Sequence, residues 1–238
     1  MNRDSMAHAA AAGGLRLLVI NPNSNGAITA QIRGLAARVL GDGVQATVVD
    51  LPQAPRAIQS PADRAVAEPL AIARIEAAVD EGFDAVALAC FDDIALSARG
   101  RLPLPIVDAV EASLALARSH ARRFAIVTTF DAAVPRIREL VALQGLAGTC
   151  TVRAAGIGVS AAAELAPQTL ARLQSAIDAA IRDDAAEAII LGSGALAGRG
   201  PVLGQGRPIP VIDSIEAAIR RAATMARNRG GYAGVSNA

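Results

Sequence analysis

The stretch RLLVINPNSNGAI, residues 16–28, decides the fold because a similar stretch occurs again in the second half of the chain. It aligns with RFAIVTTFDAAV at 123–134, an offset of 107 residues. Two further pairs align in the same order at offsets of 103 and 105 residues: ALACF (87–91) with ILGSG (190–194), and PIVDAVEASLALA (105–117) with PVIDSIEAAIRRA (210–222). Three blocks in one order at nearly one offset indicate two similar halves.

Each half alternates apolar runs with segments of helical periodicity. The apolar runs predict strands at 15–20, 44–50, 84–89, 106–107, 123–128, 151–154, 187–191 and 211–212. Between them, apolar side chains recur with the period of a helix at 26–40 and at 168–182. Continuously apolar strands separated by helices are typical of parallel sheets that are covered on both faces.

We therefore predict an α/β fold with two Rossmann-like halves related by a pseudo-twofold axis. Each half is a mainly parallel sheet flanked by helices, and the active site lies in the cleft between the halves. Residues 1–14 are predicted to form a disordered tail. The first half comprises 15–107 together with 214–238, and the second half comprises 108–213.

Composition narrows the range of functions. Hydrophobic residues make up 53% of the chain, enough for a sizeable core, and a net charge of +1 without a basic block argues against nucleic acid as a partner. The chain has no lysine, which excludes Schiff-base chemistry and a Walker phosphate loop. With only two histidines and no Cys/His cluster, we expect no metal. Two cysteines and no long apolar run predict a cytoplasmic protein that does not enter a membrane.

The aligned halves place small polar side chains at corresponding strand ends. Ligands bind open parallel sheets beyond the carboxyl ends of the strands, where Asn21, Cys90, Thr128 and Ser193 follow apolar runs. The symmetry sets Cys90 opposite Ser193, and Asn21 opposite Thr128. We expect these side chains to face a small-molecule substrate across the cleft.

Each candidate also has a purely structural interpretation. Cys90 can be a small buried hydrophobe, and Asp92 near it can be a helix N-cap or part of a solvated rim. Ser193 can belong to a tight Gly-Ser-Gly turn, or its hydroxyl can donate a hydrogen bond to an oxyanion. The turn before the first helix offers Asn23 or Ser24 as an N-cap.

Several blocks together resemble one known superfamily. They are INPNS (20–24), ACFDD (89–93), EASLALARSHARRFAIVTT (111–129) and PVID (210–213). They resemble the aspartate/glutamate/hydantoin racemase superfamily, nearest to its hydantoin and allantoin racemase branch. The similarity extends from Leu15 to about Arg227.

The resemblance implies proton transfer without a cofactor. In this superfamily a cysteine thiolate removes the proton from the carbon α to a carbonyl, and a second cysteine delivers a proton to the opposite face. Cys90 matches the first cysteine, and Ser193 stands where the second is expected, in a segment that typically reads GCAGM. The substrate-binding residues that we expect are Asn21, Ser24, Phe91, Asp92, Thr128, Thr129 and Gly194. Members commonly associate, which leaves a homo-oligomer open.

The serine leaves three functions open. The first is racemisation or epimerisation of a hydantoin-type or amino-acid-derived substrate by Cys90 and Ser193. The second is one-base chemistry by Cys90 alone, as in a decarboxylase or isomerase of the same superfamily. The third is binding of a small ligand without catalysis.

Overall fold

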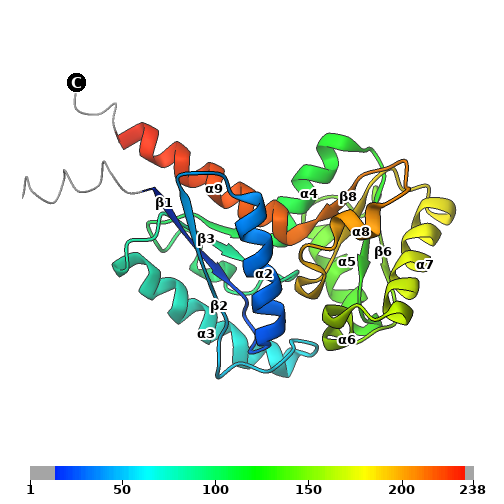
Figure 1. Ribbon diagram of the computed structural model, residues 1–238, viewed down its shortest axis with the longest axis horizontal. Coiled ribbons are helices and arrows are strands. Elements are labelled where there is room, and N and C mark those ends of the chain that lie inside the picture. Colours follow the sequence, from blue (N-terminus) through cyan, green and yellow to red (C-terminus); the bar gives the residue numbers. More distant parts are fainter. Residues whose placement is uncertain (1–13, 234–238) are drawn as a thin grey trace, which may run out of the picture.

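The computed structural model describes residues 14–233. The predicted tail at 1–14 lies outside these residues, except for Gly14. The described residues form two four-stranded sheets, both entirely parallel (Figure 1). The strand order is β2-β1-β3-β4 in the first sheet and β6-β5-β7-β8 in the second, so the two halves share one topology. The prediction of an α/β fold with two similar halves is confirmed.

The strands agree with the predicted runs to within two residues at each end. They are β1 (Leu15–Ile20), β2 (Val44–Val49), β3 (Ala85–Leu88), β4 (Ile106–Asp108), β5 (Phe124–Thr128), β6 (Cys150–Ala154), β7 (Ile189–Leu191) and β8 (Val211–Asp213). The helices are α2 (Gly26–Val39), α3 (Pro61–Asp80), α4 (Ala109–His120), α5 (Val134–Leu143), α6 (Val159–Glu164), α7 (Pro167–Asp183), α8 (Gly200–Gly204) and α9 (Ser214–Ala233). Short 3-10 turns lie at η2 (Leu96–Ala98), η3 (Asp131–Ala133) and η4 (Gly194–Leu196).

Strand β1 shows why the strands read as continuous apolar runs. Leu17 packs in a cluster with Ile32 of α2, whereas Leu18 and Ile20 pack in a second cluster with Ile75 of α3. Successive side chains therefore enter the core on opposite faces of the sheet. Both faces are buried, so the middle of the strand contains no polar residue. Each fully buried leucine or isoleucine contributes about 1.5–3 kcal/mol through the hydrophobic effect.

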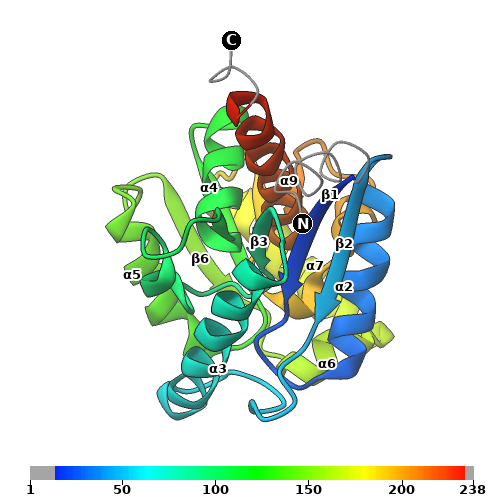
Figure 2. The ribbon, with the colours of Figure 1, turned by 90° about the vertical axis from the view of Figure 1, so that its left-hand side faces the viewer.

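Helices α4 and α9 connect the two halves. Helix α4 follows β4 of the first sheet but lies against β7 and β8 of the second. Helix α9 follows β8 but lies against β1 and β3 of the first sheet, and the two helices pack along each other (Figures 1 and 2). The division in which 15–107 and 214–238 form one half and 108–213 the other stays a prediction.

Side-chain caps begin the helices that follow the strands. Asp108 caps α4 and Asp213 caps α9, each accepting a hydrogen bond from a first-turn backbone N–H. Helix α2 is capped by Asn25, which accepts from the backbone N–H of Ala27 at 3.1 Å, and not by Asn23 or Ser24. Of the helices within 14–233, none combines the length and the apolar character that crossing a bilayer requires.

Candidate active site

A cavity of about 680 Å³ lies at the carboxyl ends of strands from both sheets. It is lined by Ala89 and Cys90 after β3, by Thr128 at the end of β5, and by Gly192 and Ser193 after β7. Because β3 and β7 occupy equivalent places in the two sheets, Cys90 and Ser193 reach the cavity from corresponding positions of opposite halves. The structure thus brings together the cysteine and the serine that the repeat pairs.

Cys90 stands where the sheet ends. The backbone N–H of Ala89 still bonds to the carbonyl of Ile20 at 2.8 Å, and Cys90 is the next residue, partly buried. Burial and the negative charge of Asp92 together raise the pKa of the Cys90 thiol to about 12, while the Arg64 cation acts in the opposite direction. In the resting protein Cys90 therefore holds its proton at neutral pH.

Two arginines neutralise the carboxylates that follow Cys90. Arg64 Nη1 lies 2.7 Å from Asp92 Oδ1 and 2.8 Å from Asp93 Oδ1. These contacts are ion pairs, because the angles at Nη1 do not suit a hydrogen bond. Arg136 Nη2 is hydrogen bonded to Asp93 Oδ1 at 2.5 Å. Because Arg64 belongs to α3 of the first half and Arg136 to α5 of the second, this ion cluster joins the halves beside the cavity.

The ion cluster gives the two carboxyls different acidities. Burial raises the pKa of Asp92 above its ordinary value. Burial acts in the same direction on Asp93, but the hydrogen bonds with Arg136 and Asp92, together with the positive charges of Arg64 and Arg136, outweigh it and lower the pKa. The structure corrects the interpretation of Asp92 as an N-cap or a solvated rim, since it is a partly buried member of an ion cluster. Neither arginine was predicted, because both come from helices distant in sequence from Cys90.

Ser193 opens the turn η4 after β7 and is only 9% exposed. Its Oγ accepts a hydrogen bond from the backbone N–H of Ala195 at 3.4 Å. A Cβ on the next residue, Gly194, would lie 2.7 Å from the carbonyl oxygen of Ala89, so the serine loop and the cysteine loop touch. A hydroxyl keeps its proton at neutral pH, so Ser193 can donate a hydrogen bond but cannot be a resting base.

Two further predicted residues line the same cavity. Thr128 Oγ donates to the carbonyl of Gly192 at 2.9 Å, which ties the end of β5 to the serine loop. The Phe91 ring lies 3.4 Å from where a Cβ on Gly192 would be. Only a glycine at 192 leaves room for both the ring and the side chain of Ile126. Gly194 and Asp92 also line the cavity.

Three predicted substrate-binding residues lie outside the lining: Asn21, Ser24 and Thr129. Asn21 is fully buried, and its Nδ2 donates to Asn23 Oδ1 and Thr29 Oγ1, both at 3.0 Å. Asn21 therefore organises the turn before α2, and Asn23 is the residue of this turn that reaches the cavity. Thr129 is buried, and the backbone N–H of Ser24 bonds to the carbonyl of Pro55.

Much of the cavity lining is apolar, and this part was not predicted. It consists of Ile28, Ile58, Pro61, Phe130, Ala132, Ala133, Pro135, Ile137 and Val159, in addition to Phe91. These residues lie in the first turns of helices and in the connections that precede them. The one available signal is positional, because helices that follow parallel strands begin at the carboxyl edge of the sheet, where ligands bind.

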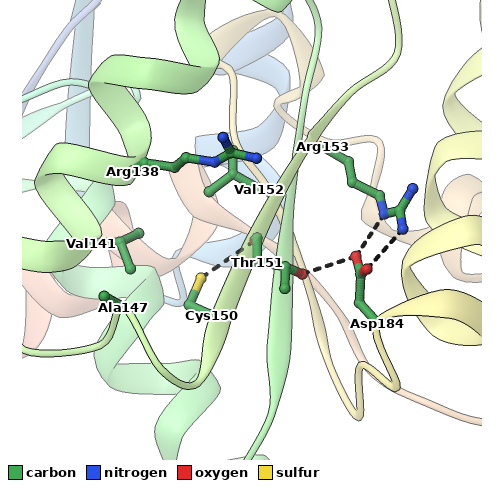
Figure 3. Close-up of a pocket in the computed structure, with 8 residues that line it drawn as sticks. All are labelled: Arg138, Val141, Ala147, Cys150, Thr151, Val152, Arg153 and Asp184. Carbon is green, nitrogen blue, oxygen red and sulfur yellow. Dashed lines mark hydrogen bonds and ion pairs between the residues drawn. The ribbon is translucent and has the colours of Figure 1, made fainter.

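The second cysteine lies in a different cavity. Cys150 begins β6 and lines a cavity of about 560 Å³, none of whose lining residues reaches the Cys90 cavity (Figure 3). Its sulfur lies 3.5 Å from the carbonyl of Thr151, and burial raises the pKa of the thiol to about 12. Figure 3 shows Arg153 directed at Asp184, which it binds through hydrogen bonds of 2.6 and 2.7 Å. Cys150 thus has no contact with the cavity that holds Cys90.

Comparisons with known proteins agree with this architecture. The family model described as Asp/Glu/Hydantoin racemase matches residues 17–222. The chain is 32% identical to a hydantoin racemase of Rhizobium meliloti, over 87% of each protein, and 32% identical to one of Paenarthrobacter aurescens, over 89% of this chain and 91% of that protein. The structure of allantoin racemase from Klebsiella pneumoniae superposes with a TM-score of 0.86 at 28% identity, over 90% of this chain and 89% of that one.

Proposed function

The chain belongs to the Asp/Glu/hydantoin racemase family, and from that membership we propose that it racemises a 5-substituted hydantoin without a cofactor. In the proposed reaction Cys90, as thiolate, removes the proton from the ring carbon next to the carbonyl. Ser193 takes the place of the second proton-transferring side chain. The observation that carries the proposal is that Cys90 and Ser193 line one cavity from opposite halves of a duplicated fold.

The charge state of Cys90 sets the first requirement of this mechanism. The thiol is the resting form, because burial and the carboxylate of Asp92 both disfavour the thiolate. The Arg64 cation, and to a smaller extent the backbone N–H of Phe91, favour the thiolate. Proton abstraction therefore proceeds through a minor thiolate population that grows with pH.

Ser193 makes the two faces of the substrate unequal. After proton abstraction the electron pair resides on the enolate, and return of the proton from Cys90 restores the starting enantiomer. Inversion requires a proton from the other face, where Ser193 supplies a hydroxyl in place of a thiol. A hydroxyl is a much weaker acid than a thiol, so we expect proton exchange to be faster than inversion.

The cavity suits a neutral ring with an apolar substituent. Its charged groups, Arg64, Asp92, Arg136 and Glu139, are engaged with one another or with Asp93. A free amino acid would need separate partners for its ammonium and its carboxylate, because a buried charge without a partner is costly. A hydantoin is uncharged, and its 5-substituent can pack against the apolar lining that includes Phe130.

The test is to follow each enantiomer of 5-benzylhydantoin in deuterated water, with protein-free buffer subtracted. Loss of the C5 proton signal together with a fall in optical rotation supports the proposal. Allantoin, aspartate and glutamate serve as competing substrates. If one of these exchanges its α-proton faster than the hydantoin, the proposed substrate class is wrong.

The second candidate function is one-base chemistry by Cys90 alone. The observation that favours it is the hydroxyl at residue 193. Exchange of the C5 proton without any loss of optical rotation would select this function over racemisation. The absence of both exchange and inversion with all four compounds would refute both functions.

A further inference from the structure

We propose that a separate cavity behind the Ser193 loop binds a small oxyanion, a phosphate or carboxylate group, and that this anion steadies the loop. The cavity has a volume of about 540 Å³ and lies between α2 of the first half and residues 197–201 of the second. It shares no lining residue with the Cys90 cavity. The binding site stands independently of the proposed reaction, and only its effect on catalysis rests on the proposed function.

The lining of this second cavity is cationic. Arg38 and Arg199 both line it, and none of its lining residues is an aspartate or a glutamate. Among the described residues Arg38 has no hydrogen-bond or ion-pair partner, and Arg199 bonds only to neutral oxygens, including the carbonyl of Ala163 at 3.0 Å. The nearby carboxylate of Asp213 is engaged with the backbone N–H groups of Gly198, Ile215 and Glu216, so an oxyanion in the cavity would face two positive charges that no carboxylate of the lining neutralises. Guanidinium groups bind phosphate and carboxylate through paired N–H donors.

Arg199 carries a second indication of a missing acceptor. Its Nε is buried and has no hydrogen-bond partner among the described residues. Buried N–H groups are nearly always paired, and this Nε would gain a partner if the guanidinium turned toward an acceptor in the cavity. A small rotation of the guanidinium would allow Nε and a terminal nitrogen to bind one anion together.

The backbone brings Arg38 against the same loop. A Cβ on Gly198 would lie 2.7 Å from Arg38 Nη2, so the guanidinium packs directly on the glycine. Gly198 has a φ of +76°, a left-handed conformation that glycine adopts without strain. A side chain at 198 would therefore displace Arg38 and fill the place of the proposed anion.

One side chain links this cavity to the serine loop. Gln31 Nε2 donates to the carbonyl of Ala195 at 3.0 Å and to that of Ala197. Arg199 Nη2 lies 3.5 Å from Gln31 Oε1, so Gln31 contacts both the arginine and the turn η4 that Ser193 opens. An anion that fixes Arg199 also fixes Gln31, and with it the turn that positions the Ser193 hydroxyl.

Binding is tested by calorimetric titration of the full chain with inorganic phosphate at constant ionic strength. We expect saturable binding, and we expect Arg38→Gln and Arg199→Gln each to weaken it by about tenfold, the loss of one charge-assisted contact. Arg118→Gln is the matched control, since this exposed arginine of α4 carries the same charge outside the cavity. Arg136→Gln tests whether phosphate binds beside Cys90 instead.

The possible outcomes test the anion site and its effect on the Ser193 loop separately. No saturable binding, or affinity unchanged in both Arg38→Gln and Arg199→Gln, overturns the site, and a loss confined to Arg136→Gln assigns phosphate to the Cys90 cavity. Arg38→Gln removes no hydrogen bond or ion pair among the described residues, only the packing on Gly198, so this variant keeps the test valid if Arg199→Gln fails to fold. If phosphate binds but alters hydantoin inversion equally in the wild type and Arg38→Gln, the effect on the loop is wrong. A protein that binds phosphate but lacks hydantoin exchange refutes only the proposed function.

Discussion

The pKa of Cys90 makes the pH dependence of proton exchange a direct test of the proposed base. An ordinary thiol has a pKa of 9.0, and burial together with Asp92 raises that of Cys90 to about 12. At pH 8 a group with a pKa of 12 is ionised to a fraction of about 10⁻⁴, against about 10⁻¹ for a pKa of 9. If the thiolate is the base, the exchange rate rises about tenfold per pH unit between about pH 7 and pH 8.5, where the hydantoin is still uncharged.

The variant Asp92→Asn tests the pKa of Cys90 in a known direction. The carboxylate of Asp92 destabilises the thiolate, so its removal lowers the pKa of Cys90. The whole profile then moves to lower pH, and each pKa unit lost gives about tenfold more thiolate at pH 8. Asp178→Asn is the control, because it removes an equal charge from the ion pair with Arg207, outside the cavity.

The assay measures the thiol and the reaction separately. Alkylation by iodoacetamide, read peptide by peptide in a mass spectrometer, follows Cys90 and Cys150 independently as the pH changes. Deuterium exchange at C5 of 5-benzylhydantoin follows the reaction over the same range. A plateau of Cys90 alkylation at or below pH 8, or equal profiles for Asp92→Asn and the wild type, would refute this account of the thiol.

Three other substitutions test the surroundings of Cys90. Ser193→Cys restores a thiol on the second face and should raise the inversion rate of 5-benzylhydantoin by about 10²-fold, measured by polarimetry; an unchanged rate would count against the paired arrangement. Gly194→Ala places a Cβ 2.7 Å from the carbonyl oxygen of Ala89 and should lower the free energy of unfolding in urea by about 1–3 kcal/mol. Arg136→Gln removes a cation from the ion cluster and should slow exchange at pH 8 by about threefold, a small effect because Arg136 is partly exposed. Arg138→Gln on the same helix should leave the exchange rate unchanged. If both variants slow exchange equally, the cause is a general disturbance of α5 and not the loss of the Arg136 cation.

The fold could be predicted from the sequence because duplication leaves a signal in each half. Aligning 16–28 with 123–134 identifies β1 and β5, which occupy the same place in their sheets. The alignment of 105–117 with 210–222 likewise pairs β4 and α4 with β8 and α9. Continuously apolar strands then predicted parallel sheets, since such strands must be buried on both faces.

The candidate site could be predicted only where it follows the ends of strands. Cys90 and Ser193 are located by the repeat, because equivalent strand ends meet at one cavity. Arg64 and Arg136 could not be predicted, because their ion pairs depend on how α3 and α5 pack around the loop after β3. Asn21 was predicted to bind substrate because it follows a strand end. Its position in the sequence does not reveal that its side chain turns inward and donates to Thr29.

The central claim is that Cys90 removes the proton from the carbon α to the substrate carbonyl. The most direct measurement is the proton NMR signal at C5 of each 5-benzylhydantoin enantiomer in deuterated water, with wild-type protein, Cys90→Ala and Cys150→Ala. The account predicts that Cys90→Ala, folded by circular dichroism, loses exchange of the enantiomer whose C5 proton faces Cys90, while Cys150→Ala retains it. Exchange by Cys90→Ala at the wild-type rate would contradict the claim.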